Sequence, residues 1–197
     1  MTIAVNMLTY NGASAFIREA LGSVYPFIDE IRVYDTGSTD DTLEVVKTLF
    51  PKVIISQHDV QHLGKIWTQS PKDRELTRLL NQIKQETQAD WILKIDDDEI
   101  FPSGLIHEMF AVEHNEKGFI YSVPFIHVGG KNYRVNYIKR FFKNIGNVEW
   151  LGDYGLETLA ISKSRIRSTK CPAFNNYFYH LGGLRTDKDR EHDYSSF

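Results

Sequence analysis

Four consecutive acidic side chains, Asp96 to Glu99, follow directly on the short apolar run 91–95. Such a run is typical of a buried strand. Side chains two residues apart in an extended segment point to the same side, so Asp96 and Asp98 project together from its carboxyl end. At about 6 Å their charges repel by roughly 0.7 kcal/mol in water and by about 3 kcal/mol at the effective dielectric of a protein cleft. A bound cation would remove that cost.

Carboxylate oxygens suit Mg²⁺ or Mn²⁺, ions that keep water ligands and bridge to substrate phosphates. The acidic run therefore predicts a metal-dependent site for a phosphorylated ligand. Within it, Asp97 is expected to point away and Glu99 to support the loop. The alternative is a solvated acidic turn without chemistry.

A chain of 197 residues with 42% hydrophobic and 13% aromatic content suits one domain with a sizeable core. A formal net charge of -3 and a pI near 6.2 argue against a nucleic-acid binder, whose surface would be basic. Cys171 is the only cysteine, which excludes an internal disulfide and a Cys-rich zinc site. No apolar run reaches the roughly 18 residues of a membrane-spanning helix, so we expect a soluble, cytoplasmic protein.

The elements that must position the acidic run follow from the periodicity of the first hundred residues. Strands are predicted at 3–9, 31–35, 52–56 and 91–95. Helices are predicted between them, capped by Ser14, by Thr39 or Asp40, and starting near Pro71 or Lys72. The polar stretch 57–71 is predicted to be a long loop, and loops of that length are often functional.

Alternating strands and helices indicate a parallel sheet covered on both faces, which binds ligands at the carboxyl ends of its strands. Tyr10, Asp35 and the acidic run all lie at such ends. Beyond residue 115 the strand-like pieces 118–125, 133–142, 148–151 and 156–161 predict an antiparallel extension of the same domain.

The residue types at these strand ends are those that a nucleotide diphosphate requires: a flat ring, a base or ribose acceptor, and a metal seat. Here the chain resembles the GT-A glycosyltransferases, in particular family 2. The matching residues are Leu8-Thr9-Tyr10-Asn11, the segment 33–42 with its Asp35-Thr36-Gly37-Ser38-Thr39-Asp40-Asp41-Thr42, and the segment 90–99. Their order and spacing are similar to the TYN, DxGSxDxT and DxD elements of that family.

The resemblance implies an α/β GT-A (nucleotide-diphospho-sugar transferase) fold, with a mostly parallel central sheet flanked by helices and a smaller antiparallel C-terminal extension. Residues 1–197 would form one domain, with a nucleotide-binding half (1–100), an acceptor-side half (101–186) and a polar tail or linker (187–197). That end is compatible with a longer multi-domain chain. Together with the compact length, it also resembles the small N-terminal transferase domain of a capsid-glycosylating protein of large algal viruses.

The activity that the resemblance implies is metal-dependent transfer of a sugar from a nucleotide diphosphate, usually UDP, to a hydroxyl of a glycan or glycoprotein, with Mn²⁺ or Mg²⁺ as cofactor. Thr9 and Tyr10 would line the nucleoside pocket, Asp35 would accept from the base, and Asp96 and Asp98 would face the ribose and the metal. A core tyrosine is the alternative for Tyr10.

Two arginines and one histidine extend the predicted donor site. Arg74 and Arg78 lie where many members contact the donor, although the local sequence does not reproduce the family's Ala-Arg-Asn segment, and exposed helical arginines are the alternative. His180 lies where GT-A enzymes can supply a last metal ligand, with a satisfied core or surface histidine as the alternative. Arg185, just beyond it, could meet a phosphate.

The acceptor side matches less closely. The segment 149–157 resembles a loop in which related enzymes place an acidic residue, often as His-Glu, but Leu156 replaces that histidine. Asp153 and Glu157 are the candidates for the catalytic base, and ordinary surface acids are the alternative. Family 2 favours inversion, and a retaining outcome stays open.

Two other classes of protein compete with this interpretation. A nucleotidyltransferase would usually carry a Gly-rich, basic phosphate loop after its first strand, and the segment 7–13 has no basic residue. A non-catalytic nucleotide-sugar or carbohydrate-binding module would have a degenerate site, whereas Asp35, Asp96 and Asp98 are all present.

Overall fold

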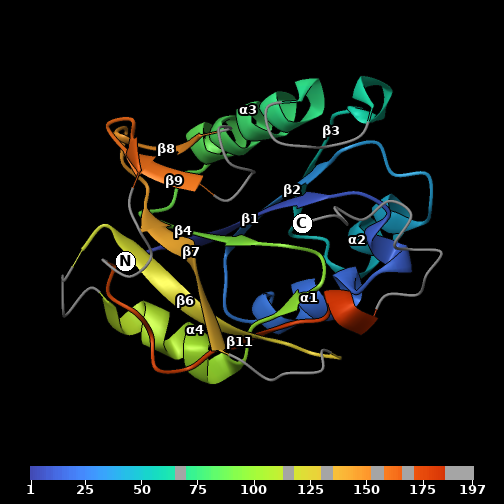
Figure 1. Ribbon diagram of the computed structural model, residues 1–197. Coiled ribbons are helices and arrows are strands. Elements are labelled where there is room, and N and C mark those ends of the chain that lie inside the picture. The colour runs from blue at the N-terminus through green and yellow to red at the C-terminus, as the bar shows by residue number, and fades with distance from the viewer. Residues whose placement is uncertain (65–69, 113–117, 130–134, 152–157, 166–170, 185–197) are drawn as a thin grey trace.

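A computed structural model describes residues 1–64, 70–112, 118–129, 135–151, 158–165 and 171–184. An eight-stranded sheet runs in the order β3-β2-β1-β4-β7-β6-β11-β5, and a three-stranded sheet in the order β10-β9-β8 (Figure 1). The strands are β1 (Ile3–Thr9), β2 (Glu30–Asp35), β3 (Ile54–Gln57), β4 (Trp91–Ile95), β5 (Glu99–Ile100), β6 (Ile120–His127), β7 (Val135–Lys143), β8 (Val148–Leu151), β9 (Thr158–Ile161), β10 (Ser164–Arg165) and β11 (Phe178–His180). The α-helices are α1 (Ile17–Val24), α2 (Thr42–Leu49), α3 (Pro71–Glu86) and α4 (Ser103–Phe110).

The strand directions bring distant segments to one edge of the large sheet. β1 pairs in parallel with β2 and β4, and β2 in parallel with β3. β7 is antiparallel to both β4 and β6, so β6 runs in the same direction as β4, and β11 is parallel to β6. The carboxyl ends of β1, β2, β4, β6 and β11 therefore lie along the same edge, where parallel sheets bind ligands.

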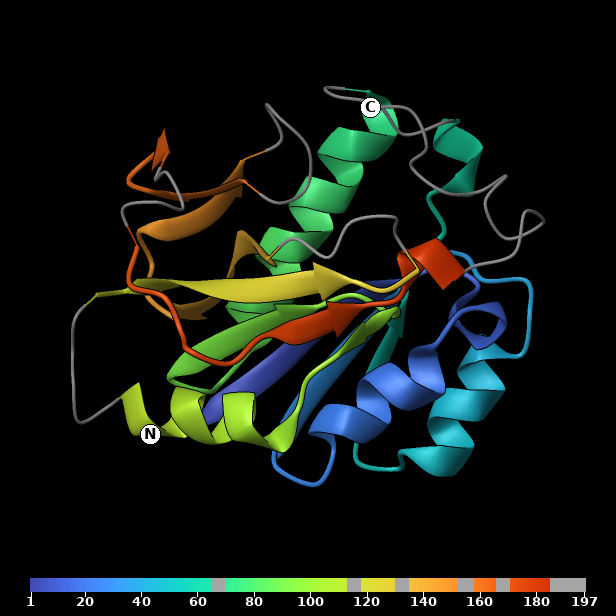
Figure 2. The ribbon, with the colours of Figure 1, turned by 60° about the horizontal axis from the view of Figure 1, so that its bottom comes forward.

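Helices cover both faces of this sheet (Figure 2). On one face α1, α2 and α4 bury apolar side chains such as Leu21, Val46 and Ile106 in one core cluster with residues of β1, β2 and β4. On the other face α3 packs through Leu80 against β4 and the second sheet. The predicted parallel α/β sheet is confirmed, and the predicted antiparallel pieces are divided between the large sheet and the small one.

The helix caps differ from prediction at two places. Ser14 ends a 3₁₀ turn, Gly12–Ser14, and α1 begins only at Ile17 without a side-chain cap. α2 begins at Thr42, whose backbone N–H donates to Asp40 Oδ1 at 3.0 Å. Ser14 donates to the other oxygen of Asp40, Oδ2, through its backbone N–H and its hydroxyl, both at 2.9 Å. These side chains tie two loops together, a long-range role that local sequence does not reveal.

The start of α3 agrees with prediction. The helix begins at Pro71, and Ser70 caps it by accepting from the backbone N–H of Asp73 at 3.0 Å. By contrast, α4, β5, β10 and β11 were not predicted from the sequence. The three strands are only two or three residues long, too short to show a periodicity. No helix among the described residues is long and apolar enough to cross a membrane.

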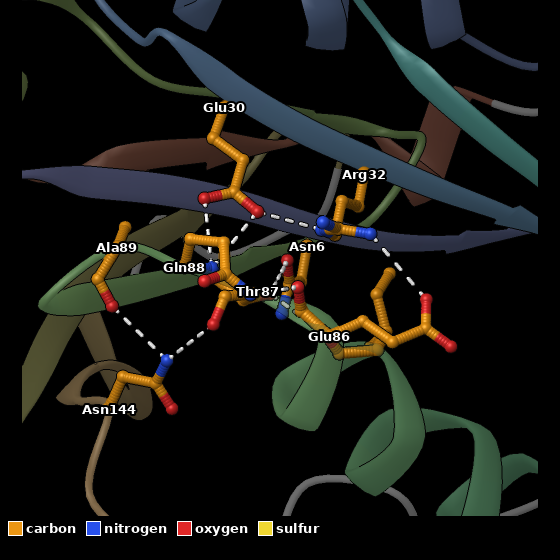
Figure 3. Close-up of polar contacts among 9 residues, drawn as sticks. Asn6, Glu30, Arg32, Glu86, Thr87, Gln88, Ala89 and Asn144 are labelled. Atoms are coloured by element: carbon orange, nitrogen blue, oxygen red, sulfur yellow. Dashed lines mark hydrogen bonds and ion pairs between the residues drawn. The ribbon is translucent and has the colours of Figure 1, made fainter.

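A polar network holds the segment that leads into β4 (Figure 3). Asn144 Nδ2 donates to the carbonyl oxygens of Thr87 and Ala89 at 3.0 and 3.1 Å. Glu30 accepts from the backbone N–H of Gln88 at 3.0 Å. Because β4 carries the acidic run at its other end, these bonds help fix where that run emerges from the sheet.

Candidate functional site

The loops that follow β1 and β2 are bonded to each other at the sheet edge. The hydroxyl and the backbone N–H of Thr36 both donate to the carbonyl oxygen of Thr9 at 2.9 Å. The backbone N–H of Asn11 donates to Ser38 Oγ at 2.8 Å, and Asn11 Oδ1 accepts from the backbone N–H of Thr39 at 2.8 Å. The two motifs seen in the sequence thus form one surface.

Asp35, the predicted base acceptor, is only 1% exposed. Its carboxylate accepts from the backbone N–H groups of Gly37 and Ser38 at 3.3 and 3.2 Å. Gly37 has a φ of 108°, which a residue with a side chain rarely adopts. The turn therefore orients the carboxylate, and contact of Asp35 with a base stays a prediction.

Tyr10 lies half-buried beside a cation that the sequence did not single out. Lys72 Nζ is 5.7 Å from the centroid of the Tyr10 ring and donates to Gln61 Oε1 at 2.5 Å. Burial lowers the pKa of Lys72. A lysine in the first turn of a helix has no distinguishing sequence signal, so only the fold could place it next to Tyr10.

Asp97 links the acidic run to the end of β1. The hydroxyl of Thr9 donates to Asp97 Oδ2 at 2.7 Å, and both side chains are buried. A Cβ on Gly12 would lie 2.5 Å from that hydroxyl oxygen, so the contact requires glycine there. Contact of Thr9 with a nucleoside stays a prediction.

Asp96 is held by two cations. Arg140 Nη2 lies 2.5 Å from its Oδ2, and Lys94 Nζ donates to its Oδ1. Burial opposes ionisation of Asp96, but Arg140 and Lys94 outweigh it and hold the pKa of Asp96 well below its usual range. Although two cations neutralise its charge, the Asp96 carboxylate can still accept a hydrogen bond from a hydroxyl, because its side chain is about a third exposed.

Glu99 stabilises the acidic turn through hydrogen bonds, as expected from the sequence. Its Oε2 accepts from the backbone N–H of Asp96 at 2.9 Å, and its Oε1 from Arg140 at 2.7 Å. Glu99 and Arg140 are 1% and 2% exposed. Burial raises the pKa of Glu99 to about 8, with Arg140 opposing the shift and Asp96 adding to it.

Asp98 and His180, two of the predicted metal ligands, are brought together by the fold. His180 Nε2 lies 3.5 Å from Asp98 Oδ2, and the backbone N–H of Leu181 donates to the carbonyl oxygen of Asp98 at 2.8 Å. A Cβ on Gly182 would lie 2.6 Å from the His180 ring and 3.1 Å from Asp98 Oδ2. The missing side chain of Gly182 therefore makes the approach possible.

A second histidine, missed in the sequence, completes this group. His127 ends β6 and pairs with His180 in the parallel register between β6 and β11. The Nδ1 atoms of the two rings are 2.8 Å apart, and the rings meet edge to face at 88°. Burial and the neighbouring His180 lower the pKa of His127.

The other predicted site residues are two arginines on α3 and three residues outside the described ranges. Arg74 is exposed on α3, and Arg78 on the same helix pairs with Glu75 at 2.6 Å, so contact of either arginine with a donor stays a prediction. Asp153, Glu157 and Arg185 lie outside the described residues, so their roles stay predictions.

The donor atoms at this edge suit a divalent cation only in part. No group of three His, Cys, Asp or Glu side chains arranged to hold a metal ion occurs in the described parts of the chain. Asp98 and His180 can supply one oxygen and one nitrogen ligand, and the absence of a side chain at Gly182 lets them approach each other. Mg²⁺ and Mn²⁺ commonly take their other ligands from water and substrate phosphates, so two protein ligands fit such a site.

Comparison with known proteins assigns this chain to one protein family. The model for glycosyl transferase family 2 matches residues 4–178. An uncharacterised glycosyltransferase of Rickettsia typhi is 30% identical over 127 residues, covering 63% of this chain and 38% of that protein. The SPbeta prophage-derived glycosyltransferase SunS of Bacillus subtilis is 31% identical over 100 residues, covering 51% of this chain and 21% of SunS. The matches thus span about two fifths or less of these relatives' length.

Solved structures share the fold. S. aureus TarS in complex with UDP-GlcNAc has a TM-score of 0.61 at 17% identity, covering 100% of this chain and 62% of that one. Glucosyl-3-phosphoglycerate synthase from Mycobacterium tuberculosis in complex with phosphoglyceric acid has a TM-score of 0.52 at 22% identity, covering 79% and 62%. The expected GT-A fold is confirmed.

Proposed function

Because the chain belongs to glycosyltransferase family 2, we propose that it transfers a sugar from a nucleotide diphosphate donor, a UDP-sugar, to a hydroxyl of a glycan or glycoprotein. The observation that carries the proposal is the 3.5 Å approach of His180 Nε2 to Asp98 Oδ2 at the sheet edge where β1, β2 and β4 end. TarS, whose fold this chain shares, binds UDP-GlcNAc in its solved structure.

In the proposed site the loops after β1 and β2 hold the nucleoside. Tyr10 offers its ring to the base, and Asp35 is fixed by its own turn as an acceptor for the base. Asp96, whose charge Lys94 and Arg140 already balance, accepts from the ribose rather than binding the metal. Lys72 adds a positive charge beside Tyr10, where the donor's diphosphate would enter.

Asp98 and His180 would hold Mn²⁺ or Mg²⁺ against the diphosphate, with the phosphates and water completing the coordination. The ion would neutralise the charge that develops on the departing nucleotide. Glu99 and Arg140 keep the acidic turn in place, so that the Asp98 carboxylate is already oriented before the donor binds.

On the acceptor side, Asp153 or Glu157 is proposed as the base that removes the proton from the attacking hydroxyl. Residues 152–157, which include both acids, follow β8 in the chain. β8 is docked on α3 through Asn81, whose amide accepts from the Trp150 N–H at 2.9 Å and donates to the Trp150 carbonyl at 3.0 Å. These two bonds fix the position of β8, the strand that precedes residues 152–157 in the chain.

The test is a thermal-shift screen of nucleotide sugars with and without Mn²⁺, followed by assay of metal-dependent UDP-sugar hydrolysis. We expect a UDP-sugar to raise the melting temperature in the presence of Mn²⁺. Asp98→Asn should remove the metal-dependent part of the shift, whereas the matched variant Asp29→Asn, exposed at the opposite edge, should behave as wild type.

A different experimental result would refute each part of the proposal. Absence of a shift with every UDP-sugar would refute the nucleoside pocket. An unchanged Mn²⁺ response in Asp98→Asn would refute the metal seat. Binding of donor and metal without any turnover, in the presence of acceptor hydroxyls, would identify a binding module instead of an enzyme.

A further inference from the structure

Two imidazole nitrogens lie within hydrogen-bonding distance at the edge of the proposed site. The Nδ1 atoms of His127 and His180 are 2.8 Å apart. A neutral imidazole has one N–H and one bare nitrogen, so one ring donates in this contact and the other accepts. The choice of donor decides whether Nε2 of His180, the nitrogen that faces Asp98, carries a proton.

The two arrangements have opposite consequences for a cation. If His180 donates through its Nδ1–H, its Nε2 is bare and presents a lone pair toward Asp98, 3.5 Å away. If His127 donates instead, His180 carries its proton on Nε2, and that N–H points at the Asp98 carboxylate and occupies the position between them. Only in the first arrangement does His180 present a lone pair beside the Asp98 carboxylate, as binding of a divalent ion by the ring requires.

From this geometry we propose that His127 is a positioning residue, which accepts the Nδ1–H of His180 and thereby holds the His180 Nε2 bare toward the metal seat at Asp98. Metal-bound histidines usually donate their second ring N–H to a nearby acceptor, which fixes the tautomer and raises the affinity for the ion. In this chain the acceptor is a second imidazole. The inference rests on the proposed function, because it assumes a metal at Asp98 and His180.

The fold places His127 for this role independently of the metal. His127 and His180 are register partners on the neighbouring parallel strands β6 and β11. Phe125 lies under both rings, 5.0 Å from the His127 centroid and 6.3 Å from that of His180, and meets each edge to face. The backbone N–H of Val128 donates to the carbonyl oxygen of His180 at 2.9 Å, which locks the two strand ends together. Both rings are thus held in fixed orientation.

Two substitutions separate the hydrogen bond from the packing. His127→Asn keeps an acceptor near the position of Nδ1, whereas His127→Phe keeps a ring against Phe125 but has no acceptor. The readout is the affinity for Mn²⁺ in the presence of UDP and without any sugar donor, measured by the electron paramagnetic resonance signal of free Mn²⁺. Melting temperatures without metal check that both variants fold.

We expect His127→Phe to weaken Mn²⁺ binding by about tenfold or more and His127→Asn to stay within about threefold of wild type, as for other residues that orient a metal ligand. Wild-type affinity in His127→Phe would overturn the inference. An equal loss in both variants would also overturn it, because the imidazole itself would then be a ligand.

Variants of the two proposed ligands distinguish this failure from failure of the proposed function. If Asp98→Asn and His180→Ala lose Mn²⁺ binding while His127→Phe retains it, only the role of His127 is wrong. If Asp98→Asn and His180→Ala bind Mn²⁺ as wild type does, the metal seat itself is wrong, and the role of His127 falls with it.

Discussion

The acidic run shows that neighbouring residues of one type can have different tasks. Asp97 is bonded to Thr9, Glu99 accepts from the turn and from Arg140, and Asp96 is balanced by two cations. Asp98 is left facing a histidine from another strand. The sequence predicted the loop-supporting role of Glu99, but the ion pair of Asp96 with Arg140 depends on β7, which the fold brings beside β4.

Gly182 gives a prediction about a single residue. In Gly182→Ala the new Cβ would lie 2.6 Å from the His180 ring and 3.1 Å from Asp98 Oδ2, so the ring must shift from its present position beside Asp98. We expect Mn²⁺ affinity in the presence of UDP to fall about tenfold or more, as when a metal ligand loses its orientation.

The control for this substitution is Gly22→Ala. A Cβ on Gly22, in the exposed part of α1, meets nothing within 4 Å. Alanine in a helix is about 1 kcal/mol more favourable than glycine, so this variant should melt slightly higher and bind Mn²⁺ unchanged. Normal Mn²⁺ affinity in Gly182→Ala would show that the approach of His180 to Asp98 is not needed for the ion.

Among the elements, β4 and its preceding segment decide where the site forms. The strand is fully buried between β1 and β7. The segment 87–90 before it is held by hydrogen bonds to the side chains of Asn144 and Glu30. Apolar periodicity predicted β4 correctly, because a buried strand reads as a continuous apolar run. The bonds that hold its start come from distant residues and leave no local pattern.

Asn144→Ala tests this anchor. The substitution removes two donors to the Thr87 and Ala89 carbonyls, so we expect a loss of about 1 to 3 kcal/mol in the free energy of unfolding, measured by urea denaturation. Asn147→Ala is the matched control, since Asn147 is exposed and pairs with Ser162 through its backbone carbonyl. Equal stability of the two variants would contradict the role of the Asn144 side chain.

The charge cluster of Lys94, Asp96, Glu99 and Arg140, in which only Asp96 is partly exposed, affects the stability of the molecule as a whole. Burial raises the pKa of Glu99 from 4.5 to about 8. The folded chain then keeps a proton that the unfolded chain has lost, so the contribution of Glu99 to stability is present below pH 4.5 and is lost as the pH rises to about 8.

Urea denaturation at pH 5 and pH 8 measures this linkage. Glu99→Gln cannot ionise at this position, so wild type should lose about 1 kcal/mol or more relative to the variant between the two pH values. A stability difference between wild type and Glu99→Gln that does not change with pH would contradict the raised pKa of Glu99.

The alternation of strands and helices, the α/β class and the three motifs after β1, β2 and β4 were all predictable from the amino-acid sequence. Those features are local, since they follow from side-chain periodicity and from residues close together in the chain. The tertiary structure alone decided that β11 returns in parallel beside β6, which places His180 next to Asp98 and His127 next to His180. A strand of three residues carries too little periodicity to predict, and its partners are chosen by packing across the whole sheet.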